Sequence, residues 1–368
     1  MLQRLYVHNY RCLENFEFKP GLAASSLLIG RNGTGKSNVA RVLKIFQHIG
    51  RGANRVGSLI TPADFAMGRS NAPIRLELEV NLSGQSFRYG IAFELPKGFR
   101  ELRVLDESLE MNSAVVFSRQ HASVTLPRGA IPRAESQFGI DWHLIALPVI
   151  QEPSIADPLR LFRHWLARMM ILAPIPKLMD GDSSAESLEP AEDCHNFADW
   201  LSGLLSQYPA AYSTISDYLK QVMPDIAEFK NLPTGNNAKS LVVHFEANGI
   251  DIDLPFKELS DGEKCFFLCA VVLAANKAYG PVLAFWDEPD NYLSLSEVGH
   301  FILALRRGFQ RGGQIIMTSH NGETIRKFSD ENTWVLDRKS HLEPVVIRLL
   351  EDLDPNPDLV QALLLGEI

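Results

Sequence analysis

The chain has 368 residues, and at about 100–200 residues per domain this length predicts two or three structural units. Hydrophobic residues make up 46% and charged residues 22%, which excludes a disordered or fibrous chain. The net charge of −8 comes from one segment, Leu178 to Leu219, which holds eight acidic residues and no Lys or Arg. A solvated surface explains the acidic segment most simply, and a docking site for a partner protein is the alternative. Because the net charge comes from this segment, another part of the protein can still carry a basic surface.

The sequence favours a cytoplasmic protein that makes no membrane contact. Residues Met1 to His8 have mixed polarity and read as a first strand rather than a signal peptide. The longest strongly apolar run, Cys265 to Ala275, is about half of the roughly 20 residues that a bilayer span requires. The four cysteines show no paired spacing and fit reduced thiols.

Hydrophobic periodicity predicts an α/β fold with an antiparallel lobe and a helical insertion. Strands are expected at Leu2–Asn9, Phe16–Phe18, Ser25–Gly30, Ile74–Val80, Phe87–Leu95, Leu102–Met111, Val115–Leu126, Val282–Trp286 and Gln314–Thr318. Helical patterns occupy Ser37–His48, much of 157–223 and the apolar stretch that begins near Cys265. We therefore expect an N-terminal lobe over residues 1–150, an acidic helical insertion over 151–240 and a C-terminal lobe over 241–368.

The strongest motif is Gly30-Arg31-Asn32-Gly33-Thr34-Gly35-Lys36-Ser37, which lies between a predicted strand and a predicted helix. Glycines in this pattern let backbone amides turn toward phosphate oxygens at a helix N-terminus. The ammonium of Lys36 would reach the β and γ phosphates, and the hydroxyl of Ser37 would ligate Mg²⁺. A glycine-rich turn that merely caps a helix has no need of the Lys-Ser pair, so the motif predicts a nucleotide site.

A second motif is the apolar strand Val282–Trp286, which ends in Asp287 and Glu288. Ligands of open α/β sheets collect at the carboxyl ends of strands. Asp287 is therefore a candidate Mg²⁺ ligand, and Glu288 a candidate base for the water that attacks the γ phosphate. Two acids at a solvated strand end are the plain alternative.

Two further segments are candidates for contact with a nucleotide. Ser260 and Glu263 have the spacing of a helix capping box, and Gly262 between them would allow an anion to approach the helix. The capping role alone would also explain these residues. His320 follows a buried strand, where it could sense the γ phosphate.

In this order, the motifs resemble those of the ATP-binding-cassette (ABC) ATPases, within the branch that contains RecF, the SMC proteins and the ATPase domain of OLD-type nucleases. The segments Asn9–Leu13 and Asp287–Leu293 resemble the opening and the acidic motif of that branch. The resemblance covers residues 1 to about 50 and 240 to 340.

The resemblance implies a P-loop NTPase of the ABC-head type that uses ATP and Mg²⁺. It implies a homodimer in which two protomers sandwich ATP. The signature segment Ser260–Glu263 of one protomer would face the P-loop, Gly30–Ser37, of the other. Glu288, His320 and Lys36 would be catalytic, and Ser37 and Asp287 would bind the metal. The nucleotide-binding residues would be Arg11, Asn32, Gly33, Thr34, Gly35, Lys36, Ser37, Asn38, Ser260, Gly262 and Glu263.

The chain departs from that branch in two respects. The glutamine that normally contacts Mg²⁺ has no assigned counterpart, because Gln47 falls in the predicted helix and Gln85 in the antiparallel lobe. Asp64 lies near the expected place and is a substitute candidate. Ser294 occupies a position where relatives often carry His or Asp.

The sequence predicts neither the long coiled coil of SMC-like proteins nor a fused nuclease, and we expect Leu349–Ile368 to form only a short acidic-apolar tail. We therefore expect a dimeric sensor or regulator ATPase with a separate effector, such as a TOPRIM-like or other nuclease, in antiphage defence or DNA repair. A nucleotide-gated assembly scaffold with slow hydrolysis is the alternative, and a transporter ATPase subunit is a third.

Direct contact with nucleic acid is a further hypothesis. The segment Arg31–Leu76 holds eight basic residues and one acid, Asp64, and this charge excess would suit a phosphate backbone. A solvated helix face explains the same charges equally well.

Overall fold

The computed structural model describes residues 1–127, 135–151, 157–235 and 238–353. The expected C-terminal tail therefore lies outside the described residues from position 354 onward. The chain divides into two compact units, the first made of Met1–Ala23, Ile29–Met169 and Asp330–Ile368, and the second of Ala24–Leu28 and Met170–Ser329. These units differ from the three segments expected above, because both ends of the chain contribute to the first unit.

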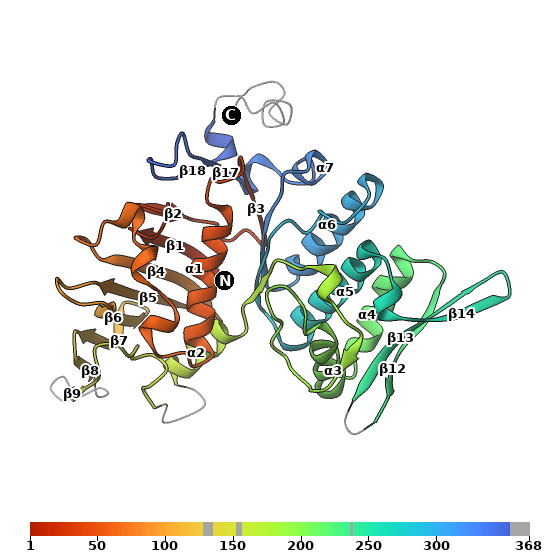
Figure 1. Cartoon of the computed structure of the whole chain (residues 1–368), viewed down its shortest axis with the longest axis horizontal. Helices are drawn as coiled ribbons and strands as arrows, with labels where there is room; N and C mark the ends of the chain where they lie inside the picture. The colour runs from red at the N-terminus through yellow and green to blue at the C-terminus, as the bar shows by residue number, and fades with distance from the viewer. Residues whose placement is uncertain (128–134, 152–156, 236–237, 354–368) are drawn as a thin grey trace. The chain divides into compact units, whose positions relative to one another are not determined.

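The first unit is built on an eight-stranded antiparallel sheet in the order β2-β1-β4-β5-β6-β7-β8-β9 (Figure 1). Its strands are β1 (Leu2–His8), β2 (Phe16–Phe18), β4 (Ile74–Leu82), β5 (Gln85–Glu94), β6 (Arg103–Met111), β7 (Ala114–Gln120), β8 (Ser123–Pro127) and β9 (Glu135–Gly139). An antiparallel pair, β17 (Thr333–Asp337) and β18 (Val346–Leu349), also belongs to this unit.

Helices α1 (Lys36–Gly50) and α2 (Pro158–Ala167) cover one face of this sheet. Alternate residues of β4 are buried, as expected for a sheet with one covered face. Phe46 of α1 lies 5.9 Å from Tyr89, and Phe162 of α2 stacks 5.7 Å from Phe87, measured between ring centroids. The strand and helix predictions for this region are therefore confirmed, apart from one strand.

The expected single strand Val115–Leu126 is wrong, because the chain reverses at His121 to form β7 and β8. Gln120 pairs with Ser123 across a two-residue turn, and His121 has a φ of +50°. Such turns usually carry Asn or Gly, and neither residue is present to signal this one.

The second unit contains four parallel strands in the order β10-β15-β16-β3, and each is buried along its whole length. These strands are β3 (Ser25–Ile29), β10 (Met170–Leu172), β15 (Leu283–Trp286) and β16 (Gln314–Thr318). Helix α5 (Asp261–Tyr279) precedes β15, α6 (Leu295–Gln310) connects β15 to β16, and α7 (Gly322–Ile325) follows β16. Phe301 of α6 contacts both Trp286 of β15 and Phe266 of α5, so the helices and the sheet share one core.

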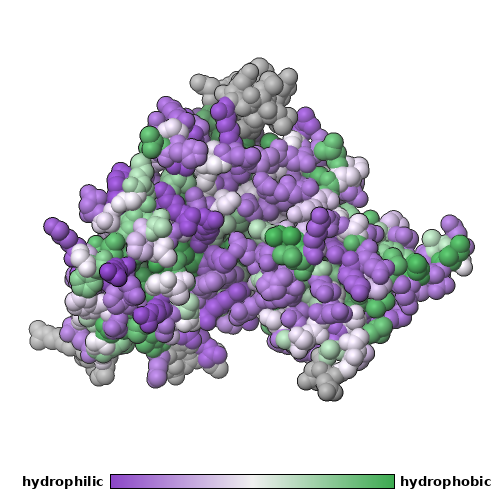
Figure 2. Space-filling view, viewed as in Figure 1, coloured by the Kyte–Doolittle hydropathy of each residue, from purple (hydrophilic) through white to green (hydrophobic). Residues whose placement is uncertain are grey.

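The remainder of the second unit corrects the expectation of a purely helical insertion. Helices α3 (Phe197–Gln207) and α4 (Ala211–Val222) stand beside a small sheet of β11 (Asp182–Ser183), β12 (Ile226–Pro233), β13 (Lys239–Ala247) and β14 (Ile250–Pro255). Strands β10 and β11 are three and two residues long, too short to show a period of two in the sequence. Strand β14 leaves Ile250 and Ile252 exposed, and hydrophobic side chains are visible at this end of the molecule (Figure 2).

Within the part of the chain that the structure describes, no helix combines the length and the apolar character that a membrane crossing would need.

Candidate nucleotide site

The P-loop, residues 30–37, lies in the first unit and needs glycine at three positions. Gly30, Gly33 and Gly35 have φ angles of +146°, +81° and +100°, which disfavour any side chain. A Cβ atom at Gly30 would lie 2.2 Å from the carbonyl oxygen of Leu336, and one at Gly35 would lie 2.7 Å from Sγ of Cys12. A Cβ at Gly33 would meet nothing within 4 Å, so the tip of the loop faces open space.

The P-loop is preorganised by its own side chains. Nζ of Lys36 donates to the carbonyl oxygens of Gly30, at 2.6 Å, and Arg31, at 3.2 Å, and the lysine is only 7% exposed. Oγ1 of Thr34 also donates to the carbonyl of Arg31, at 2.8 Å. Asn32 at the tip and Ser37 in the first turn of α1 are exposed. The loop therefore presents a cation and a hydroxyl at a helix N-terminus, which suits a phosphate group.

Cys12 brings the Asn9–Leu13 segment beside the P-loop region, and Arg11 of the same segment is held by Asp64. Nδ2 of Asn38 donates to Sγ of Cys12 at 3.0 Å. The guanidinium of Arg11 contacts Oδ1 of Asp64 through Nε at 2.8 Å, and its backbone N–H donates to the carbonyl of Asp64 at 2.7 Å. Arg11 is thus held by a carboxylate while 39% of its side chain stays exposed.

Asp64 and Gln47 are both committed to structural contacts, which argues against either as the missing metal-contacting residue. The second oxygen of Asp64 accepts from the backbone N–H and the hydroxyl of Thr61, at 2.9 and 3.0 Å, and Asp64 is 5% exposed. Gln47 is buried and donates to the carbonyl of Met169 at 2.6 Å. The sequence did not reveal the contacts of Asp64 with Arg11 and of Gln47 with Met169, because those partners lie 53 and 122 positions away along the chain.

In the second unit, Asp287 and Glu288 lie at the carboxyl end of β15, as predicted. The hydroxyl of Thr318, at the end of the neighbouring strand β16, donates to Oδ1 of Asp287. The same hydroxyl accepts from the backbone N–H of Glu288 at 2.9 Å, and Glu288 has a φ of +48°. Sequence reasoning missed Thr318, because its position two residues before His320 was the only available signal.

His320 lies beside Glu288. Nε2 of His320 is 3.4 Å from Oε1 of Glu288, and both side chains are partly exposed, at 41% and 33%. Nδ2 of Asn291 donates to Oε2 of Glu288 at 2.5 Å. A carboxylate oriented by neighbours and open to solvent is suited to bind and activate a water molecule.

The capping box predicted at Ser260 and Glu263 is present at the start of α5. Ser260 is the N-cap of α5, and its backbone N–H donates to Oε2 of Glu263 at 2.7 Å, while the amide of Glu263 donates back to the serine hydroxyl at 3.3 Å. A Cβ at Gly262 would lie 3.2 Å from the carbonyl oxygen of Tyr292. The glycine thus lets the acidic motif, residues 287–293, approach the first turn of α5.

Oxygen groups that suit Mg²⁺ and a nucleotide occur in each of the two units. The described residues hold no group of three or more His, Cys, Asp or Glu side chains that could bind a metal. The hydroxyl of Ser37 in the first unit and the carboxylate of Asp287 in the second are each a hard oxygen group of the kind that Mg²⁺ takes as a ligand alongside phosphate oxygens. All four cysteines are free and buried, as expected for reduced thiols, and burial raises the pKa of Cys265 and of Cys269 to about 12.

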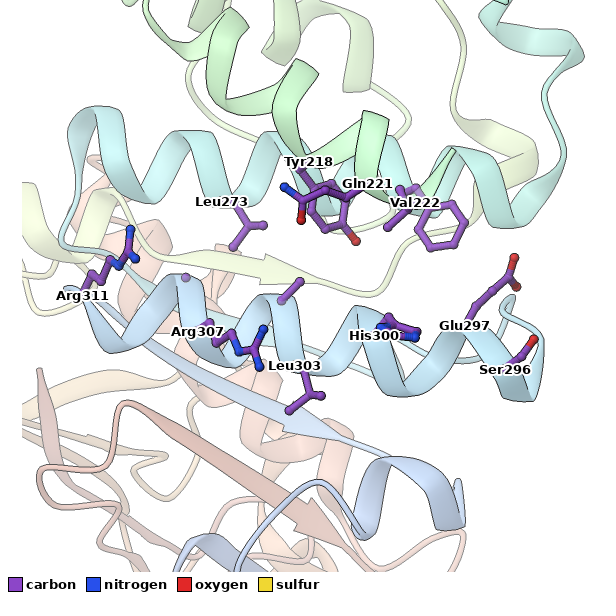
Figure 3. A pocket seen from close by; sticks show the side chains of 13 residues that line it. Tyr218, Gln221, Val222, Leu273, Ser296, Glu297, His300, Leu303, Arg307 and Arg311 are labelled. Carbon is purple, nitrogen blue, oxygen red and sulfur yellow. The ribbon is translucent and has the colours of Figure 1, made fainter. Parts of the chain in front are cut away.

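A separate hollow of about 640 Å³ lies between α4, α5 and α6 (Figure 3). Leu273 and Leu303 contribute apolar surface, and Arg307 and Arg311 lie toward one end. None of the predicted site residues lines it, so it is distinct from the acidic strand end.

Comparisons with solved structures confirm the expected fold. A structure of an SMC head bound to the C-winged helix domain of ScpA gives a TM-score of 0.54 at 13% identity, and covers 95% of this chain and 99% of that one. An SMC head with an extended coiled coil, bound to the C-terminal domain of ScpA derived from Pyrococcus furiosus, gives 0.51 at 12% identity, with 95% and 97% covered. The chain therefore has the fold of an SMC-head P-loop ATPase.

Sequence comparisons add the family. UvrABC system protein A of Synechocystis sp. is 30% identical over 125 residues, which make up 34% of this chain and 12% of that protein. The chain thus matches a small part of that relative. The model of the family described as "AAA domain, putative AbiEii toxin, Type IV TA system" matches residues 25–326, from β3 through α7, and the chain belongs to this family.

Proposed function

We propose that this protein is a dimeric ATPase that converts ATP and water to ADP and phosphate. The pairing of Glu288 with His320 at the end of a buried parallel strand, 3.4 Å apart, carries the proposal. A carboxylate beside an imidazole suits the roles of base and phosphate sensor, and the P-loop of the same chain has the Lys-Ser pair.

Each residue has a distinct role in this proposal. Lys36 and the backbone amides of the P-loop bind the phosphates, and Asn32, Thr34 and Asn38 support that loop. Ser37 and Asp287 would be the ligands of Mg²⁺, which would neutralise charge that develops on the phosphates. Glu288 orients the attacking water and accepts its proton, while His320 contacts the γ phosphate. Family membership and the motifs in each unit support this assignment.

A homodimer closed by ATP would complete the site. Ser260, Gly262 and Glu263 at the start of α5 would meet the nucleotide held by the other protomer, and Arg11 would lie near it. Sedimentation with ATP tests this step, because a Glu288→Gln variant should accumulate as a dimer that ADP does not support.

Turnover is the direct test of the function. Phosphate release by the native chain should be Mg²⁺-dependent, and Glu288→Gln should lower kcat by about 10²–10⁴-fold because it removes the base. The matched control is Glu246→Gln, an exposed glutamate of β13, which should leave kcat unchanged. Equal turnover in Glu288→Gln and the native chain would contradict the assignment.

The wider role that we propose is a sensor or regulator that acts with a separately encoded effector, in antiphage defence or DNA repair, in the cytoplasm. Family membership and the SMC-head fold support it, since the two SMC heads above are bound to ScpA domains. Mass spectrometry of proteins that co-purify at native expression tests it. A nuclease would support the proposal, and a membrane protein would favour a transporter subunit.

An assembly scaffold with slow hydrolysis is the second candidate. The Glu288→Gln variant separates the two, because a scaffold would keep its biological activity without turnover, whereas a cycling regulator would lose it. Direct nucleic-acid contact through the basic segment Arg31–Leu76 should appear as binding that falls steeply with salt, and binding that does not respond to salt would exclude it.

A further inference from the structure

We infer that Thr318 is a positioning residue for the hydrolysis proposed above, and that two loops beside it form one hydrogen-bonded body. The acidic loop comprises residues 287–293, and the histidine loop comprises residues 319–324. The inference rests on the proposed function for its kinetic part, and on contacts within the second unit for its structural part.

One hydroxyl serves both acidic residues. Thr318 is fully buried as the last residue of β16, and its Oγ1 donates to Asp287 while accepting from the backbone N–H of Glu288. A hydroxyl has one hydrogen and two lone pairs, so it can make both contacts at once. The hydrogen bond to Oδ1 of Asp287 fixes the rotation of that carboxylate, which determines where the other oxygen points.

The same contact supports a backbone conformation that Glu288 would not adopt unaided. Non-glycine residues with a φ near +48° are uncommon and are held in place by their surroundings. Here the support is the hydrogen bond from the Glu288 amide to Thr318. Losing that hydrogen bond should release the backbone at Glu288, and with it the side chain that faces His320.

A second tie links the two loops through a buried carboxylate. Asp290 is 4% exposed, and its Oδ2 accepts from Oγ of Ser319 at 2.6 Å and from the hydroxyl of Thr324. Ser319 and Thr324 are themselves fully buried. A buried carboxylate is tolerated only with such partners, so Asp290 binds the acidic loop to the histidine loop on both sides of His320.

The hydrogen bonds of Ser319 and Thr324 to Asp290 lie on either side of His320, so the two loops cannot shift independently. Movement of His320 toward or away from a γ phosphate would carry Asp290 with it, and Thr318 would pass the change to Asp287 and Glu288. The base and the sensor would then respond to the nucleotide together, because they belong to the same packed body.

The kinetic test compares Thr318→Val, which keeps the shape, with Thr318→Ser, which keeps the hydroxyl. Thr318→Val should lower kcat by about 10–100-fold with KM for ATP little changed, and Thr318→Ser should restore most of the loss. The control is Ser26→Ala on the adjacent strand β3, since the Ser26 hydroxyl is buried without a hydrogen-bond partner. Native kcat in Thr318→Val, or no recovery in Thr318→Ser, would overturn the positioning role.

Hydrogen exchange tests the structural part without relying on turnover. Asp290→Ala should speed amide exchange in both the acidic loop and the histidine loop, while Asp290→Asn, which keeps an acceptor oxygen, should do so much less. Faster exchange in only one loop, or in neither, would overturn the single body. A native chain without turnover would instead refute the proposed ATPase, and would leave the exchange result to decide the structural inference.

Discussion

Replacing Gly35 of the P-loop by alanine should destabilise the protein more than the same change at Gly52, although the two backbones match. Their φ angles are +100° and +101°, so both alanines carry the same left-handed strain of about 1–3 kcal/mol. At Gly52 the new Cβ meets nothing within 4 Å. Restriction of the unfolded chain returns about 0.4–1 kcal/mol at each site, so Gly52→Ala should cost about 1–2 kcal/mol.

At Gly35 the alanine methyl group is also crowded. Its Cβ would lie 2.7 Å from Sγ of Cys12 and 3.1 Å from Cγ2 of Val345, and both partners are buried side chains. Forcing a methyl group into packed surroundings costs about 1–3 kcal/mol more. We therefore expect Gly35→Ala to lose about 2–5 kcal/mol of unfolding free energy in total, with a displaced P-loop.

Urea unfolding of both variants measures the difference in unfolding free energy. It appears as a shift of the unfolding midpoint, while the dependence of the free energy on urea concentration stays constant. Titration with a fluorescent ATP analogue should show at least tenfold weaker binding in Gly35→Ala and native binding in Gly52→Ala. Equal losses of stability in the two variants would refute the reasoning. The requirement for glycine would then come from the φ angle alone, and not from the packing of Cys12 against the loop.

Two further predictions concern other parts of the molecule. Glu107→Ala should lower the free energy of unfolding by about 3–5 kcal/mol, because it leaves the buried guanidinium of Arg119 without its carboxylate partner. Glu110→Ala on the same strand should change that free energy by less than about 0.5 kcal/mol, and urea titration measures both values. Burial raises the pKa of Glu107 above its ordinary 4.5, so the cost of ionising this buried carboxyl is absent below pH 4.5 and lowers the stability of the fold as pH rises through the folded pKa; a native chain without that slope would contradict this. Gly262→Ala should press on Tyr292 and weaken ATP-dependent dimerisation at nearly unchanged melting temperature, and an unaltered sedimentation profile would count against it.

The chemistry of the candidate site was readable from the sequence wherever it depends on neighbours along the chain. A glycine-rich turn between a strand and a helix has few other uses for its Lys-Ser pair, and two acids after four buried apolar residues mark a strand end. The capping box at Ser260 was equally local, since its partners are three residues apart. The reversal at His121 is not predictable from the sequence, because that turn lacks the Asn or Gly that usually marks one.

The sequence by itself determined the motifs, their order and the elements that carry them, because helix caps, glycine turns and hydrophobic periodicity act over a few residues. Only the tertiary structure decided the hydrogen bonds between polar groups that lie far apart along the chain. Asp64 pairs with Arg11 across 53 positions, and Thr318 joins Asp287 across 31. Burial supplies the physical reason: a polar group removed from water must find whichever partner the fold brings near, and the linear sequence does not specify that partner.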